Sequence, residues 1–314
     1  LTFRDYAPYN DALLELNDYT GDSIVAMNGD LTIQLDGTSS VTGGIGVNVV
    51  NGSLTVTGDG SLSATGSSYG IWVSGGNLIV DGGEVEGIVN AESGNHGVAA
   101  SSIEVKNGGK LTGTSSGAIG VFASDNITVS GSSELNGTGT GEHTIGVNVT
   151  GSIAVSGSGK LTGISTNDTG VNAIASITVS GSGNLTGTST NYVGILARWV
   201  VFNGGTITAT GDIAILDYYD ADDPTLSEPT DLSGSVAYVA TANITASSTG
   251  AVPYVPANCV SYKYFHVEPV APGGADIPKT GDTATPYLWA GLALLAIMGL
   301  LTNAALHRRK RHGG

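Results

Sequence analysis

The 314-residue sequence contains a single cysteine, Cys259. One thiol cannot form an intramolecular disulfide, which excludes the cross-linked frameworks of many small secreted domains. Stability must therefore come from packing and backbone hydrogen bonds.

Basic residues are also scarce: 11 Lys and Arg stand against 27 Asp and Glu, a formal net charge of −16. Four of the basic residues, at 308–311, lie in the tail, and Asp282 is the one acidic residue after position 280. This leaves 26 acidic and 7 basic side chains in residues 1–280, a net charge of −19. We expect such a surface to repel nucleic acid and anionic lipid.

Helix-period apolar patterns are absent between residues 20 and 218, which argues against an α/β fold. The sequence has 49 glycines without a collagen period, which indicates many turns. An apolar triplet recurs about every 24 positions, and a period this regular predicts stacked repeats. The triplets begin at Leu31, Leu54, Leu78, Ile103, Ile127, Ile153 and Ile177.

Each repeat carries two further apolar anchors. The first set is Leu62, Val85, Leu111, Leu135, Leu161, Leu185 and Ile207. The second set follows a glycine, as in Gly70-Ile71 and Gly120-Val121. Three short alternating runs per period predict three strands and three turns. We therefore predict an all-β fold, a parallel β-solenoid over residues 21–218 with about 24 residues and three short strands per coil. We expect the coil to be right-handed, as parallel crossovers are in general.

The ends of a solenoid expose unpaired strand edges and need covers. We expect residues 1–20 to form an N-terminal cap and residues 219–268 a C-terminal β cap. Within the second cap, strands are predicted at 235–242 and 260–267. Residues 269–276 are expected to be a linker.

Three elements follow one another at the end of the chain. The first is the pentapeptide Ile277, Pro278, Lys279, Thr280 and Gly281. An uncharged apolar run at 287–306 and a basic tail at 307–314 come after it. As a helix the run would span roughly 30 Å, one bilayer core, and basic clusters beside a span stay cytoplasmic. We therefore expect a C-terminal transmembrane helix, with the bulk of the chain outside the cell.

This arrangement resembles the cell-wall sorting signal of Gram-positive surface proteins, whose pentapeptide reads Leu-Pro-any-Thr-Gly. The resemblance implies that a sortase cuts between Thr280 and Gly281 and joins Thr280 to a peptidoglycan amine. It implies a secreted protein anchored covalently to the cell wall, in the membrane only transiently through its C-terminal helix. Ile277 replaces the usual Leu, which leaves the particular sortase open, and an ordinary single-pass anchor is the alternative. We also expect that an export signal has been removed or precedes Leu1.

The repeats resemble those of clostridial surface proteins known as carbohydrate-binding parallel β-helices. The resemblance covers residues 20–218 and is seen in segments such as NGDLTI at 28–33 and GSGKLTG at 157–163. It implies a polysaccharide or host surface glycan as partner, in some members with calcium, and it points to no specific binding residue.

Aromatic residues make up only 6% of the sequence, so those within the repeats stand out. Aromatic faces stack on sugar rings, which makes three of them candidate glycan contacts: Tyr69, Trp72 and Tyr192. The alternative is that Ile71 or Trp72 fills the core of this coil.

A polysaccharide-degrading β-helix enzyme would need an acid and a base carboxylate within about 5 to 10 Å. The repeat carboxylates fall in different phases of the period, so no catalytic residue is predicted. They are Glu84, Glu86, Glu104, Glu134, Glu142 and Asp168. Glu142 and His143 are adjacent, and we expect both in a solvated turn.

A dense acidic stretch could hold a hard cation such as calcium. It comprises Asp217, Asp220, Asp222 and Asp223. The spacing of these residues matches neither an EF-hand nor a calcium β-roll, so we expect the protein to have no cofactor. A calcium ion bound by this stretch is the alternative. His96 and His143 are further metal-ligand candidates, although unpaired surface histidines are commoner.

The sequence as a whole predicts a non-catalytic, wall-anchored adhesin or polysaccharide-binding module. A structural stalk or coat without a specific ligand is the competing hypothesis, and an enzyme is the third.

Overall fold

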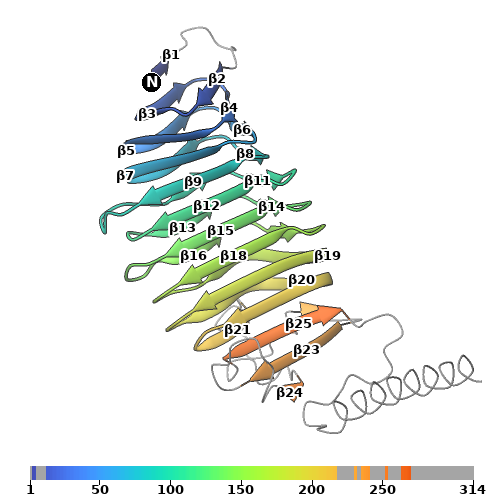
Figure 1. Ribbon diagram of the computed structural model, residues 1–314. Coiled ribbons are helices and arrows are strands. Elements are labelled where there is room, and N and C mark those ends of the chain that lie inside the picture. The colour runs from blue at the N-terminus through green and yellow to red at the C-terminus, as the bar shows by residue number, and fades with distance from the viewer. Residues whose placement is uncertain are drawn as a thin grey trace, which may run out of the picture. The chain divides into compact units, whose positions relative to one another are not determined.

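The computed structural model describes residues 2–4, 12–217, 230–231, 235–240, 252–253 and 263–269. All of them belong to one compact unit of the chain. They form a parallel β-solenoid of about eight turns with about 24 residues per turn, as predicted (Figure 1). Among these residues there is no helix that could cross a membrane. The sorting signal at 277–314 and the apolar run at 287–306 lie outside the described ranges.

Three parallel ladders of strands make up the solenoid. The first ladder contains β2 (Ala12–Asn17), β4 (Leu31–Asp36), β6 (Leu54–Gly58), β8 (Leu78–Asp81), β11 (Ile103–Lys106), β14 (Ile127–Val129) and β17 (Ile153–Val155). The second ladder contains β9 (Glu84–Val89), β12 (Lys110–Ser115), β15 (Glu134–Gly139) and β18 (Lys160–Ser165). The third ladder contains β10 (Val98–Ala100), β13 (Ile119–Ala123), β16 (Ile145–Val149) and β21 (Ile213–Asp217).

Longer strands run through more than one ladder because the chain stays extended around a corner. They are β3 (Thr20–Met27), β5 (Thr38–Val50), β7 (Ser61–Ser74), β19 (Val171–Ser189) and β20 (Val193–Thr210). Figure 1 shows successive coils stacked in sequence order, so each coil hydrogen-bonds only to its neighbours.

The pairing register confirms the predicted period. In the first ladder Leu31 pairs with Leu54, and the same position continues to Ile177 and Val200. The apolar anchors of all three ladders are buried, while alternate residues point outward because strand side chains alternate between faces. The core is therefore a set of in-register Leu, Ile and Val columns.

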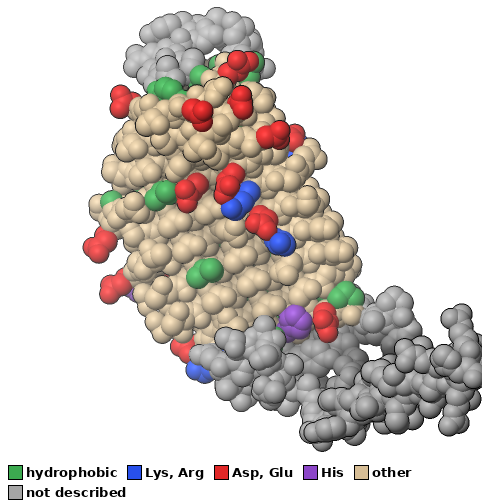
Figure 2. Space-filling view, viewed as in Figure 1, with side chains coloured by type: hydrophobic (Ala, Val, Ile, Leu, Met, Phe, Trp, Pro, Cys, Tyr) green, Lys and Arg blue, Asp and Glu red, His purple; other side chains and the backbone are tan. Residues whose placement is uncertain are grey.

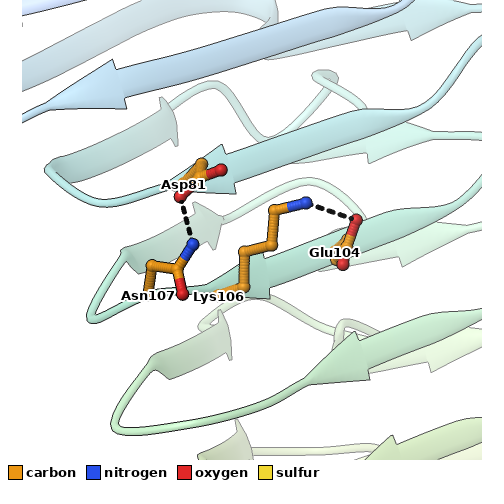
Figure 3. Close-up of polar contacts among 4 residues, drawn as sticks. All are labelled: Asp81, Glu104, Lys106 and Asn107. Carbon is orange, nitrogen blue, oxygen red and sulfur yellow. Dashed lines mark hydrogen bonds and ion pairs between the residues drawn. The ribbon is translucent and has the colours of Figure 1, made fainter.

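The corner after the first ladder requires left-handed backbone. Gly131, Gly157 and Gly181 have φ values of 67°, 64° and 66°, and Asn107 takes the same corner with φ 54°. Asparagine tolerates this conformation better than most residues because its side chain can bond locally. Asn107 Nδ2 donates to Asp81 Oδ1 at 2.7 Å on the preceding coil, beside a 3.2 Å ion pair of Lys106 and Glu104 (Figure 3).

Some glycines lie inside strands, although the high glycine content was interpreted as a sign of turns. A Cβ atom on Gly137 of β15 would lie 2.3 Å from the carbonyl oxygen of Gly146 in β16. Gly113 and Gly163 have the same close approach in neighbouring coils. In these coils the second and third ladders thus meet backbone to backbone, and a Cβ atom does not fit there. Ala64 and Ala209 take the same register position in coils nearer the two ends.

The solenoid begins earlier than expected at its N-terminal end. β2 pairs in parallel register with β4, so stacking starts at residue 12, inside the range expected to be a cap. β1 (Thr2–Arg4) pairs with β3 in the third ladder.

Antiparallel strands cover the C-terminal end, close to where the sequence predicts them. β23 (Ser235–Ala240) pairs with β25 (Tyr264–Pro269), and β25 pairs antiparallel with β20. Phe265 of β25 is fully buried. The two short strands β22 (Thr230–Asp231) and β24 (Val252–Pro253) also pair here, with β20 and β23.

Candidate functional site

Four rings gather on the outer surface of the third ladder. Tyr69 and Trp72 belong to β7, His96 precedes β10, and Phe122 belongs to β13. We call these four residues the aromatic patch. Trp72 and Phe122 each follow a buried residue, Ile71 or Val121, so they point outward and are partly exposed.

The rings of the aromatic patch are in continuous contact over three coils. Tyr69 and Trp72 stack with centroids 5.1 Å apart and planes 12° apart. His96 meets Tyr69 edge-on at 5.7 Å and lies 5.0 Å from Phe122. These distances are those of favourable aromatic pairs, so each ring helps to fix its neighbours.

His96 is held in its uncharged form within the patch. Burial lowers the pKa of its imidazole to about 4, because charging a ring removed from water is costly. Its Nδ1 atom is buried without a hydrogen-bond partner. The aromatic patch therefore carries no charge at neutral pH. The environment of His96 is aromatic, and the described residues include no group of three or more metal-ligating side chains.

Asparagines extend the line of outward residues on both sides of the patch. Register pairing aligns one residue per coil in what we call the outer column: Asn48, Trp72, Ala99, Phe122, Asn148 and Asn172. Asn172 Nδ2 donates to Asn148 Oδ1 at 2.9 Å. The Oδ1 atoms of Asn48 and Asn172 are buried without a partner. Ala99, between the two large rings, is covered by surrounding side chains and only 4% exposed.

Isoleucines flank the outer column. Ile45 pairs with Tyr69, and Ile119 pairs with Ile145 further along. All three isoleucines are partly exposed. The surface around the rings is thus apolar with amides at its ends.

The three predicted glycan contacts divide into two places. Tyr69 and Trp72 come together in the aromatic patch, and Ile71 fills the core in place of Trp72. Tyr192 is half exposed but lies about five coil steps away, roughly 24 Å along the solenoid axis.

From the sequence, Phe122 was missed, and His96 was considered only as a metal-ligand candidate and not as part of an aromatic group. Phe122 follows Gly120-Val121 just as Trp72 follows Gly70-Ile71, so aligning the repeats could have revealed it. His96 directly precedes Gly97-Val98 just as Tyr69 directly precedes Gly70-Ile71, so the same alignment could have placed it beside Tyr69.

Carboxylates on the second ladder bind lysines on adjacent coils. Glu84, Lys110, Glu134 and Lys160 share one register position. Lys110 Nζ lies 2.5 Å from Glu84 Oε1, and Lys160 Nζ lies 3.0 Å from Glu134 Oε1. The hydrogen bond that Lys110 donates to Glu84 raises the pKa of Lys110. Figure 2 shows acidic and basic side chains alternating in a short row on the viewed face, amid a largely uncharged surface.

Glu84 and Glu134 thus share one phase of the repeat, contrary to the expectation that the repeat carboxylates all fall in different phases, whereas the others lie apart. Glu86 accepts a hydrogen bond from Ser63, and Asp168 accepts one from the Thr169 backbone at 2.6 Å. Glu142 and His143 are exposed in a turn where His143 has φ 55°, as expected.

The acidic stretch weighed as a calcium site falls at the edge of the described region. Asp217 ends β21, and its side chain is outside what the structure describes. Asp220, Asp222 and Asp223 also lie outside the described residues.

No protein-family model, curated protein or solved structure matches this chain closely enough to show a relationship.

Proposed function

We propose that the solenoid is a non-catalytic polysaccharide-binding module of a cell-surface protein. The aromatic patch carries this proposal. Sugar rings have apolar faces that pack on aromatic rings, and hydroxyls that bond to amides such as Asn148 beside them. The aromatic patch and the asparagines of the outer column offer both in one outward-facing line, without charge at neutral pH.

We propose further that the protein acts at the cell wall as an adhesin. The support is the C-terminal sequence, in which the pentapeptide 277–281, the apolar run and the basic tail occur in the order of a sorting signal. In this proposal a sortase links Thr280 to peptidoglycan, and the solenoid is presented outside the cell.

A structural stalk without a ligand is the second candidate. The observation that favours it is the lysine–carboxylate row of the second ladder, since these charges are engaged between coils. A stalk gives no reason for a line of partly exposed rings, which is why binding is preferred.

Retention on insoluble and arrayed polysaccharides tests the proposal. The full chain is compared with a Trp72→Ala/Phe122→Ala variant, and Trp199→Ala is the matched control because Trp199 is 44% exposed outside the patch. Thermal unfolding checks that all three proteins are folded. We expect the wild type and Trp199→Ala to be retained on some polysaccharides, and the patch variant to lose this retention. Each assay is repeated with calcium and with chelator.

Equal retention of the folded patch variant would contradict the assignment of the site. Absence of retention for the folded wild type would favour the stalk.

A further inference from the structure

We propose that the ligand is an uncharged, extended, β-linked polysaccharide that lies along the solenoid axis, with successive sugar units on successive coils of the outer column. This inference rests on the proposed function and adds the class of glycan and its direction of binding.

The spacing of the outer column supports this direction. Paired strands lie about 4.8 Å apart, close to the length of one sugar unit in an extended chain. Trp72 and Phe122 are two pairing steps apart, so they sit under alternate units. Asn148 and Asn172 follow at the next two steps, and the amide hydrogens that are not used in the bond between them provide polar contacts for further units.

The strands leave little room for a ligand that runs the other way. β10 has 3 residues and β13 has 5, and each is bounded by a turn or corner of the coil. At about 3.3 Å per residue such strands are too short to support several sugars. The axial direction, in contrast, offers six aligned positions from Asn48 to Asn172.

Charge selects against acidic glycans. No basic side chain occurs in the outer column, and His96 beside it is uncharged at neutral pH. The four lysines of the described residues each lie within 3.2 Å of a carboxylate: Lys106, Lys110, Lys160 and Lys263. A uronate or sulfate on this face would thus lack a free lysine, on a chain with a net charge of −16.

The straightness of the column selects among neutral glycans. In-register pairing at every step keeps the positions in one line, apart from the gentle twist of the sheet. Extended β-1,4-linked chains can follow such a line. In contrast, α-1,4-linked glucans coil, so they would lose contact with the column after a few units.

Calorimetric titration with oligosaccharides tests the inference. The full chain is titrated with cello-, xylo- and manno-oligosaccharides from disaccharide to hexasaccharide. Malto-oligosaccharides serve as the coiled comparison, and oligogalacturonates serve as the charged comparison. We expect affinity for at least one β-linked series to rise with length. We expect Asn172→Ala to weaken hexasaccharide binding about fivefold, the value of one hydrogen bond, and to leave the disaccharide unchanged.

The matched control is Asn136→Ala, since Asn136 occupies an outward position of the second ladder. Binding that does not depend on length, or an equal effect of Asn172→Ala on short and long ligands, would overturn the axial placement while the proposed function stands. A preference for maltohexaose or oligogalacturonate would overturn the class of glycan. Absence of binding to every oligosaccharide and polysaccharide would overturn the inference and the proposed function together.

Discussion

Single residues of the aromatic patch owe their properties to the coils on either side. His96 is uncharged because neighbouring coils bury it, and Trp72 is partly exposed because Ile71 takes the core position. From the sequence, Tyr69 and Trp72 could be named as a pair because they are three positions apart in one strand. Their contact with His96 and Phe122 depends on register across coils, so it could be predicted only by aligning the repeats.

Acid should destabilise the fold through His96. The unfolded ring gains its proton near pH 6.5 and the folded ring only near pH 4, so the unfolded state binds more protons between these values. The free energy of unfolding should therefore fall as pH drops through this window, by up to about 3 kcal/mol from this group. Denaturant unfolding of wild type and His96→Phe at pH 7 and pH 4.5 measures it.

The variant should lose less stability than the wild type on acidification. Equal losses in the two proteins would show that His96 is not the buried, uncharged group described here.

Glycine should be required at the edge where two ladders meet in the middle coils, although alanine takes the same register position nearer the ends. Gly137→Ala places a Cβ atom against the Gly146 carbonyl and should lower the free energy of unfolding by about 1–3 kcal/mol, the usual cost of overpacking. Gly131→Asn is the control, because Asn107 already occupies the equivalent corner and no atom lies closer than 4.0 Å to the added Cβ. Thermal denaturation should show a large shift for the first variant and a small one for the second.

At the scale of elements, the strands and their register could be predicted because one residue type recurs at each core position. Leu111, Leu135 and Leu161 stack directly, as their spacing predicts. β2 was harder to recognise, because Leu13 is 64% exposed while Leu16 is buried, and this mixture obscures the alternation. The glycine edge was also missed, since sequence cannot distinguish a glycine in a turn from one under a neighbouring backbone.

The C-terminal strand β25 should protect the open end of the second ladder. Phe265→Ala removes a fully buried ring and should cost about 3–5 kcal/mol. Loss of β25 would expose unpaired edge groups of β20, so the variant should also self-associate. Size-exclusion chromatography and thermal unfolding measure both effects, with Phe265→Leu as the conservative control. A monomeric variant of unchanged stability would show that β25 does not close the solenoid.

At the scale of the whole molecule, the proposed location depends on the C-terminal sequence. If a sortase acts at Thr280, Thr280→Ala should leave the protein in the membrane or medium, and Asp276→Ala, outside the pentapeptide, should stay wall-linked. Immunoblotting of lysozyme-released wall fractions distinguishes the two. Covalent attachment of the Thr280→Ala protein to peptidoglycan would refute sorting at this bond.

The central claim is that a glycan contacts the aromatic patch, and the fluorescence of Trp72 reports on it directly. The sequence has three tryptophans, so Trp199→Phe/Trp289→Phe leaves Trp72 alone. Titration of this variant with a polysaccharide that the full chain retains should give a saturable change in emission that matches the binding curve. Retention of the polysaccharide with no change in Trp72 emission would contradict the account.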